Sequence, residues 1–353
     1  MATKKKNNKK QIIRIILIFF LILIASAAFF SYDSYKKIYA PNVVLKNSSD
    51  KFLYVKTGYE FNDLVNLLYE KNLINNRSSF EWVSELKEFS VVKPGRYRLR
   101  DGMSNNELIN LLRSGNQEPI NVTFTNIRTK AQLAGRLGRK IEADSLSIIS
   151  LLTDSDFCSK YGFTTNTVMT MFIPNTYEFF WNTSAEEFFA RMAEEYKAFW
   201  TDERKQKANN IGLSQSDVSI LASIVELESQ KKDERPIIAG VYMNRLKRNM
   251  LLQADPTVIY AVGDFTINRV LKVHLQYDSP YNTYKYLGLP PGPIYFPSIS
   301  AIDAVLNYEK HSYIYFCAKE DFSGYHNFAE TMAQHSVNAR KFQKALNKRN
   351  IMK

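Results

Sequence analysis

Two glutamates, Glu226 and Glu228, stand near the end of a segment with the pattern of a helix. Ser214 and Asp217 form the S-x-x-D motif of a helix start, and the following apolar residues recur at helical spacing. At about 100° per residue, Glu228 projects near the centre of the apolar arc, whereas Glu226 projects to the other side. The arc comprises Ile220, Leu221, Ile224, Val225 and Leu227.

This placement gives the two carboxyl groups different chemistry. A carboxyl group on the apolar side of a helix loses hydration, and near the C-terminal end it feels the negative end of the helix dipole; both effects raise its pKa. A glycosidase general acid needs a raised pKa to hold its proton near neutral pH. We therefore predict Glu228 as the catalytic acid and Glu226 as a solvated or structural partner. In the alternative, the helix ends one turn earlier and Glu228 turns out to water.

Two further helices are predicted after this segment. Asp233 and Pro236 indicate the start of the first. The second is specified by Asp255 as N-cap, Pro256 at the first helical position and Gly263 beyond the end. We interpret Asp255 as a helix cap and not as a second acid.

Two polar, stiff loops follow, at residues 281–284 (Tyr-Asn-Thr-Tyr) and 288–293 (Gly-Leu-Pro-Pro-Gly-Pro). Tyrosine rings offer an aromatic surface, and hydroxyl and amide groups offer hydrogen bonds, so the loops suit sugar recognition. They could equally be plain connections, and composition does not separate the two.

The region before the two glutamates has the pattern of a scaffold. We expect a strand at 120–124, a helix from Thr129, an aromatic loop or strand at 172–180 and a helix from Ser184. None of these segments carries an obvious catalytic motif.

A smaller module precedes the scaffold and contains a pseudo-repeat. Residues 58–68 align without gaps to residues 102–112, and each copy follows a strand-like stretch, at 52–56 and 96–99. In each copy, leucines then recur at helical spacing. The pattern predicts a compact α+β module of roughly 70 residues, near the lower limit for independent folding.

Capping motifs set the helix boundaries of this module. Ser104 and Glu107 form a capping box for the helix of the second copy, and Gly115 follows near its end. Ser78 and Glu81 predict the same box for a helix between the copies.

The N-terminus has the pattern of a membrane anchor. Six Lys and Arg residues within positions 1–14 lie before or at the start of a span at 12–32, which has about the 20 residues needed to cross a bilayer. The positive-inside rule places the tail in the cytoplasm and everything after the span outside. The alternative is a cleaved signal peptide, because Ala25-Ser26-Ala27 resembles an A-x-A site.

Charge and cysteine usage disfavour other classes of protein. The net charge is +12, but half of it lies in residues 1–14, so the body has no basic patch typical of nucleic-acid binding. Cys158 and Cys317 lack metal-site spacing, as do the four histidines; the cysteines could be reduced thiols or one disulfide. We therefore expect no nucleic acid and no metal.

Several motifs in the second half of the chain resemble those of the YceG-like endolytic peptidoglycan transglycosylases. They keep the order and spacing of that family across residues 213–340. The matching runs are Ala222-Ser-Ile-Val-Glu-Leu-Glu228, Glu234-Arg235, Val241-Tyr-Met-Asn-Arg-Leu246, Leu252-Gln-Ala-Asp-Pro-Thr-Val-Ile-Tyr260, Tyr281-Asn-Thr-Tyr284, Gly288-Leu-Pro-Pro-Gly292 and Tyr325-His-Asn-Phe328 with His335.

Departures from the family pattern are mild. Tyr242-Met243 stands where a Phe-Ile type pair is found, and residues 119–200 match only loosely apart from 174–177. The resemblance implies an α+β fold with a cytoplasmic tail (1–11), a transmembrane helix (12–32), a linker (33–49), a LysM-like module (50–118) and a mixed catalytic domain with a helical active-site core (119–350). The LysM-like module could bind glycan or serve as a spacer.

In the family the second glutamate of the pair is catalytic, which corresponds to Glu228. The resemblance implies non-hydrolytic cleavage of the bond between N-acetylmuramic acid and N-acetylglucosamine, without metal or cofactor. Glu228 would protonate the leaving oxygen and then take the proton of the muramoyl 6-hydroxyl, giving a 1,6-anhydro end. Because the sugar supplies the nucleophile, no second carboxylate is required.

The remaining expectations concern the substrate and its surroundings. Nascent strands would be cut internally beside the synthases, on the outer side of the cell membrane. The alternatives are a hydrolytic muramidase, aided by Asp255, and a membrane-tethered peptidoglycan-binding scaffold. Plain loop hydrogen bonding is the alternative role for each of the candidates that would orient the sugar, which are Asn244, Gln253, Tyr281, Asn282, Tyr284 and His326.

Overall fold

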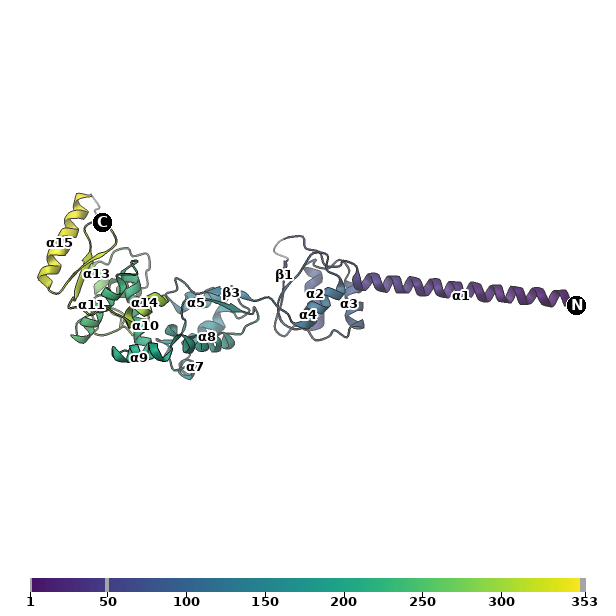
Figure 1. Ribbon diagram of the computed structural model, residues 1–353, viewed down its shortest axis with the longest axis horizontal. Coiled ribbons are helices and arrows are strands. Elements are labelled where there is room, and N and C mark those ends of the chain that lie inside the picture. The colour runs from purple at the N-terminus through teal and green to yellow at the C-terminus, as the bar shows by residue number, and fades with distance from the viewer. Residues whose placement is uncertain (1, 48–50, 350–353) are drawn as a thin grey trace. The chain divides into compact units, whose positions relative to one another are not determined.

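The structure, a computed structural model, describes residues 2–47 and 51–349 (Figure 1). Residues 1, 48–50 and 350–353 lie outside the described part, including positions 50 and 350, where two predicted boundaries fall. Helices and short two-stranded sheets mix along the chain, which confirms the predicted α+β class. Contacts divide the chain into a first unit (residues 1–120 and 180–182) and a second unit (121–179 and 183–353).

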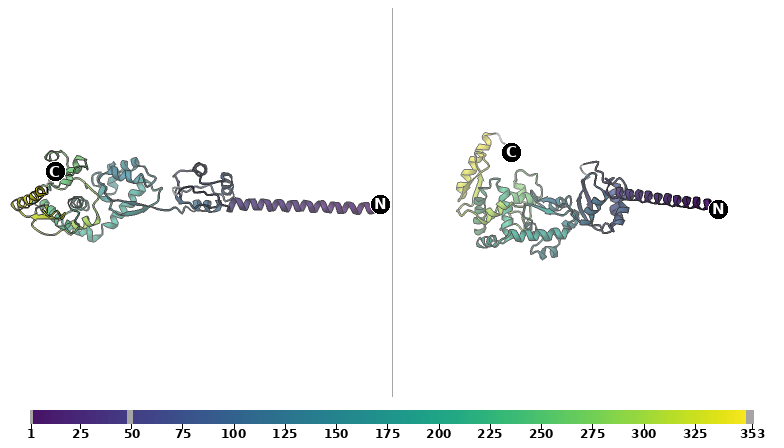
Figure 2. Two further views of the ribbon diagram at one scale, coloured as in Figure 1. Left: turned by 90° about the horizontal axis from the view of Figure 1, so that it is seen from above. Right: turned by 45° about the vertical axis from the view of Figure 1, so that its right-hand side comes forward.

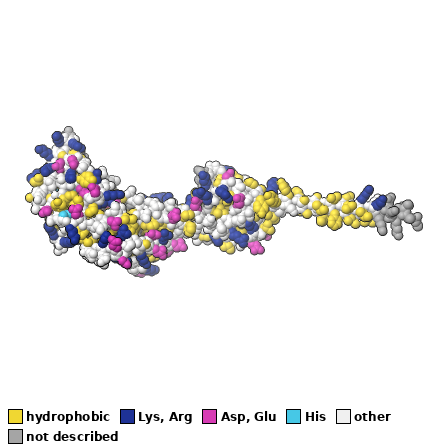
Figure 3. All heavy atoms as spheres, viewed as in Figure 1, with side chains coloured by type: hydrophobic (Ala, Val, Ile, Leu, Met, Phe, Trp, Pro, Cys, Tyr) yellow, Lys and Arg dark blue, Asp and Glu magenta, His cyan; other side chains and the backbone are white. Residues whose placement is uncertain are grey.

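The first unit begins with α1, a helix of 38 residues. Its ribbon is uninterrupted in both views of Figure 2. Its segment Lys10–Tyr39 is long and apolar enough to cross a membrane, and its apolar side chains are exposed, as the surface in Figure 3 shows. This is consistent with a single-pass anchor. The helices and strands of the unit are α1 (Ala2–Tyr39), β1 (Phe52–Val55), α2 (Phe61–Glu70), α3 (Arg77–Leu86), β2 (Gly95–Arg98) and α4 (Asn105–Ser114).

Helix α1 extends beyond the predicted span and enters the body of the first unit. The positions from 33 to 39, which the sequence indicates as linker, are its last two turns, and they contact α3 and α4. The Asn105 amide donates to the Lys37 carbonyl at 2.9 Å and to Ser79 Oγ at 3.0 Å, and Asn42 donates to Asn105 Oδ1 at 2.7 Å. The end of the helix is therefore tied to the module by buried amides.

The pseudo-repeat is confirmed as a repeated strand and helix. Strands β1 and β2 pair antiparallel, with Phe52 opposite Arg98 and Val55 opposite Gly95. Equivalent positions of the two copies are buried in α2 and in α4, so the repeat is a repeat of core contacts. The equivalent pairs are Leu64 and Leu108, Val65 and Ile109, and Leu68 and Leu112.

Two of the predicted helix boundaries in this unit are confirmed and one is wrong. The Ser104 capping box is present, and Gly115 ends α4 with φ at 71°, where a residue without Cβ is favoured. The Ser78 box does not form. Asn76 caps α3 instead by accepting from the Ser79 amide at 2.8 Å, and Glu81 pairs with Arg77 at 2.8 Å.

The first half of the second unit matches the predicted scaffold. Its strand begins at Ile120, Thr129 caps the first helix, and Ser184 caps the long helix with a capping box. The 172–180 segment contains strand β4, which pairs with β3. The elements are β3 (Ile120–Thr123), α5 (Lys130–Leu137), α6 (Ser145–Thr153), α7 (Ser155–Lys160), the 3-10 helix η2 (Val168–Met171), β4 (Thr176–Phe179) and α8 (Ala185–Phe199).

The second half of this unit holds the two glutamates. Helix α10 packs against α11 and α14, and α15 packs on the β5–β6 hairpin. Cys158 and Cys317 carry free thiols. The elements are α9 (Asp202–Asn210), α10 (Gln215–Glu228), α11 (Arg235–Lys247), α12 (Asp255–Val262), α13 (Lys272–Leu275), α14 (Ile299–Leu306), β5 (Tyr315–Ala318), β6 (His326–Ala329) and α15 (Met332–Lys348).

Candidate active site

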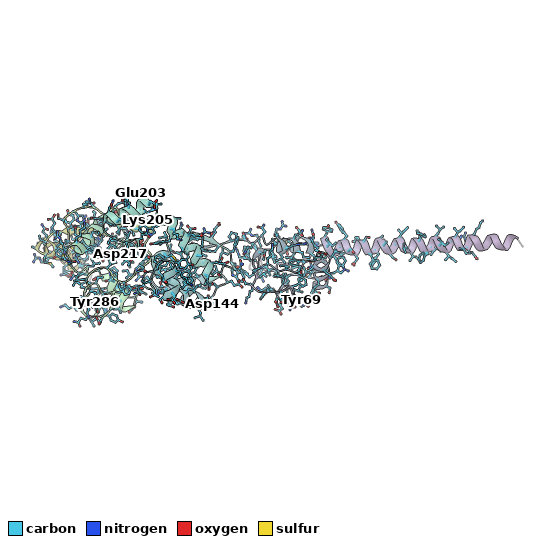
Figure 4. All side chains as sticks on the ribbon, turned by 90° about the horizontal axis from the view of Figure 1, so that it is seen from below. Tyr69, Asp144, Glu203, Lys205, Asp217 and Tyr286 are labelled. Carbon is cyan, nitrogen blue, oxygen red and sulfur yellow. The ribbon has the colours of Figure 1, made fainter. Side chains whose placement is uncertain are left out.

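Helix α10 places the two glutamates at its C-terminal end. It starts with the predicted capping box of Ser214 and Asp217, the latter labelled in Figure 4, and its last residue is Glu228. Ser229, which follows, is extended. The helix therefore does not end one turn earlier, so that alternative is wrong.

The polar face of α10 is buried as well as the apolar one. Ser219 and Ser223 are fully buried, and Ser223 Oγ accepts from the Ile294 amide at 3.1 Å. Periodicity placed this side opposite the apolar arc without deciding whether it is solvated, and α14 and the segment before it cover it. Every residue of the helix from Val218 to Val225 is consequently buried.

Glu226 serves this packing and is not solvated. Its Oε1 pairs with the buried guanidinium of Arg235 at 3.3 Å, and its Oε2 accepts from the Ser298 amide. Arg235 also donates to the hydroxyl groups of Ser298 and Ser300, at 3.1 and 3.0 Å. Of the two roles predicted for Glu226, the structural one fits these contacts.

Glu228 is half-buried, and Tyr242 of α11 donates its hydroxyl to Glu228 Oε1 at 2.7 Å. The pKa of Glu228 is raised to about 7, mainly by loss of hydration and also by the charge of Asp255, while the Tyr242 hydrogen bond and the Arg245 charge act in the opposite direction. The residue as a whole is not fully buried, so Glu228 combines some accessible surface with a pKa near neutral pH.

Asp255 lies at the site and does not cap α12. The N-cap is Ala254, one residue earlier than predicted, and no side chain caps it. The Thr283 hydroxyl accepts from the Ala254 amide at 3.0 Å, so the residue that begins the helix is held without a carboxylate. The exposed Asp255 instead accepts from the Tyr284 hydroxyl at 2.6 Å. Burial raises the pKa of Tyr284, so this hydroxyl stays protonated.

Arg245 is a buried cation that the sequence did not single out as a site residue. It donates to the Leu252 and Ile314 carbonyls, each at 2.7 Å, and stands over the ring of Tyr315. Among the described residues no carboxylate lies within 4.0 Å of it. Its charge lowers the pKa of Glu228. Its position three residues after Tyr242 on one helix was the available signal.

Gln253 has an unusual backbone conformation beside Asp255. Its φ is 50°, in the left-handed region, and its amide donates to the Thr283 carbonyl at 3.0 Å. Its side chain is exposed. Residues other than glycine are uncommon in this region, and such conformations cluster at ligand sites.

The 281–284 loop is held by Asn282, which is fully buried. Its amide donates to the Leu275 and Tyr277 carbonyls, at 3.0 and 2.7 Å, and its Oδ1 accepts from the Tyr284 amide at 3.0 Å. These contacts match the loop-bonding alternative. Tyr281 packs its ring against Tyr260 at 4.8 Å.

His326 is tied to the end of α10 through Glu234. The buried Glu234 carboxylate accepts from the His326 amide and pairs with its Nδ1, both at 2.7 Å, and it accepts from Ser229 Oγ at 3.1 Å. Ser229 follows Glu228 directly. The Glu234–His326 pair therefore holds strand β6 close to Ser229, the residue that follows the end of α10.

Asn244 is not brought together with Glu228. Its amide donates to the His311 and Tyr313 carbonyls, at 2.7 and 2.9 Å. It follows Tyr242 by two positions, about 200° around α11, so it points away from the carboxyl group that Tyr242 contacts. Asn244 fastens the 311–313 segment to the helix.

Comparison with known proteins places this geometry in a class. The endolytic murein transglycosylase of Bacillus subtilis (strain 168) is 30% identical over 312 residues, which cover 84% of this chain and 85% of that protein. The endolytic murein transglycosylase of Streptococcus pneumoniae (strain D39) is 26% identical over 81% of this chain and 58% of its own length. The chain is thus a lytic transglycosylase.

The YceG-like family matches residues 53–341, and the chain belongs to this family. The 2.6 Å crystal structure of a YceG-like protein from Listeria monocytogenes aligns with a TM-score of 0.55 and 26% identity, over 82% of this chain and 99% of that one.

Proposed function

We propose that this enzyme cuts the bond between N-acetylmuramic acid and N-acetylglucosamine inside peptidoglycan strands, with Glu228 as its acid and base. The observation that carries the proposal is the half-buried Glu228 carboxyl group, whose pKa is raised to about 7 and whose only hydrogen bond to the described residues comes from Tyr242. The names of the relatives support the substrate.

The reaction uses one carboxyl group twice. Protonated Glu228 gives its proton to the glycosidic oxygen as the bond from that oxygen to C1 of the muramoyl residue breaks. The carboxylate then accepts the proton of the muramoyl 6-hydroxyl as O6 bonds to C1. The products are a free hydroxyl on the departing sugar and a 1,6-anhydro ring, and Glu228 is again protonated. A raised pKa suits both steps near neutral pH.

Other groups at the site assist through charge and shape. The Asp255 carboxylate, held by Tyr284, offers negative charge to the positive character that develops at C1. Gln253, Tyr281 and Tyr284 are the predicted sugar-orienting residues that remain in this proposal. Asn282 and His326 act through the loop and strand that they hold.

The same Asp255 favours a second candidate, a hydrolytic muramidase in which the two carboxyl groups activate water. Mass analysis of products separates the two reactions. Purified full-length enzyme in detergent should convert glycan strands to fragments with anhydro ends, 18 mass units below the hydrolytic product on the loss of one water. A reducing end would establish hydrolysis instead.

The residue assignment has its own test. Glu228→Gln should lower the rate at least about 10³-fold, because the amide can neither give nor accept the proton. The matched control is Glu194→Gln, an exposed position of α8, which should cut like wild type. Cleavage by Glu228→Gln at the wild-type rate would contradict the assignment.

The rest of the proposal concerns placement in the cell. The six positive charges at the start of the apolar span set the tail in the cytoplasm and everything after the span on the outer side of the membrane. The module of the first unit, predicted to be LysM-like, would bind glycan or serve as a spacer. The enzyme then cuts nascent strands beside the synthases and ends their growth.

A further inference from the structure

The hydroxyl of Tyr242 meets only one of the two oxygens of Glu228. Tyr242 is 1% exposed and packs edge-on against Phe316, with ring centres 5.9 Å apart. Its hydroxyl donates to Glu228 Oε1 at 2.7 Å. No hydrogen bond from a described residue reaches Oε2, and Oε2 is not among the buried atoms without a partner, so this oxygen is unpaired and keeps some accessible surface.

The neighbouring carboxylates lack this asymmetry. Both oxygens of Glu226 are occupied, by Arg235 and by the Ser298 amide. Both oxygens of Glu234 are occupied too, by the amide and ring of His326. Of these three carboxylates, Glu228 is therefore the one that combines a fixed oxygen with a free one.

A fixed oxygen decides where the proton of Glu228 sits. A tyrosine hydroxyl has one proton to give, and burial together with the charge of Glu228 raises the pKa of Tyr242, so it remains a donor. The carbonyl-type oxygen of a carboxylic acid is a better acceptor than its hydroxyl-type oxygen. With Oε1 accepting from Tyr242, the acid proton is favoured on Oε2.

We propose that Tyr242 is a positioning residue that assigns separate tasks to the two oxygens of Glu228: Oε1 is the anchor, and Oε2 gives the proton to the glycosidic oxygen and takes it from the 6-hydroxyl. This inference rests on the proposed function of Glu228. It requires no movement of the carboxyl group between the two steps, because one oxygen performs both.

The substitution that tests this is Tyr242→Phe, which removes the hydroxyl and keeps the ring. The rate of wild type should fall as pH rises through about 7, where Glu228 loses its proton. In Tyr242→Phe the alkaline limb of the pH–rate profile should move up by about one pH unit, because the carboxylate has lost a hydrogen-bond donor. The plateau kcat should fall about tenfold, with little change in KM, because the carboxyl group is free to rotate.

The control is Tyr97→Phe in the first unit. Tyr97 is also fully buried, and its hydroxyl donates to the Lys93 carbonyl at 2.9 Å. It should lose comparable stability on thermal unfolding, yet keep the wild-type pH profile. Assays at temperatures below those at which either variant unfolds prevent differences in stability from affecting the measured rates.

The outcomes separate this inference from the proposed function. An unmoved pH limb in Tyr242→Phe, whatever the loss of rate, would reduce Tyr242 to a packing residue and overturn the inference, while the inactivity of Glu228→Gln would leave the proposed function standing. If Glu228→Gln cut normally, both would fall.

Discussion

The two sides of the C-terminal end of α10 carry the same residue type and differ in what surrounds it. On one side Glu226 meets a buried guanidinium and a backbone amide, so both its oxygens are used. On the other side Glu228 meets one tyrosine hydroxyl and keeps an oxygen free. The comparison teaches that the number of partners, more than burial, separates a structural carboxylate from one able to exchange a proton.

The strongest test of the structural side is Glu226→Gln. It should cost about 3 kcal/mol in the free energy of unfolding, because Arg235 would stay buried without its counter-charge. Denaturant unfolding measures the loss, with exposed Glu194→Gln as the control within about 0.5 kcal/mol of wild type. Activity per folded molecule should persist; its loss would place Glu226 in the chemistry and break the comparison.

A second test measures how the titration of Glu228 changes the free energy of unfolding with pH. The pKa of Glu228 is about 7 in the folded chain and ordinarily near 4.5, so the folded state binds the proton more tightly. The stabilisation that comes with this proton is complete below about pH 4 and is lost as pH rises through about 7.

Glu228→Gln lacks this titration. Wild type should therefore lose about 3 kcal/mol relative to Glu228→Gln between about pH 4 and pH 8. Unfolding of both proteins across this range provides the measurement. Parallel curves would show that Glu228 is hydrated like a surface acid, contrary to its proposed role.

The smallest effect is expected for Asp255→Asn. Removing this negative charge should lower the pKa of Glu228, so the alkaline limb of the rate should move down by a few tenths of a pH unit, opposite to Tyr242→Phe. The pH profile of cleavage measures the shift. A loss of more than about 100-fold would instead make Asp255 a direct participant, as the hydrolytic alternative requires.

Local signals in the sequence were sufficient for much of the fold. The capping boxes at Ser104 and Ser214 and the helix start at Ser184 appear at the predicted positions, because an N-cap is decided by residues within one turn. The failure at Ser78 has the same origin, since Asn76 competes for the same helix start and wins. The upward shift of the pKa of Glu228 was also predicted from the position of this residue on a single helix.

The remainder depended on distant contacts. Periodicity could not show that α14 covers the polar face of α10, which carries Ser219 and Ser223. Nor could it show that a hydrogen-bond donor on α11 reaches Glu228. It also placed Asp255 as a cap, because its sequence context is that of a helix start, while its true partner, Tyr284, lies 29 positions later. The amide of Asn244 was used by a segment 67 positions away.

The continuity of α1 into the first unit has a mechanical consequence. Buried amides hold its last turn, so the helix leaves the apolar span without a swivel at that point. Residues 33–39 form about 10 Å of this stiff rod at 1.5 Å per residue, and this length packs against α3 and α4. Any tilt or rotation of the apolar segment of α1 is therefore passed on to this module.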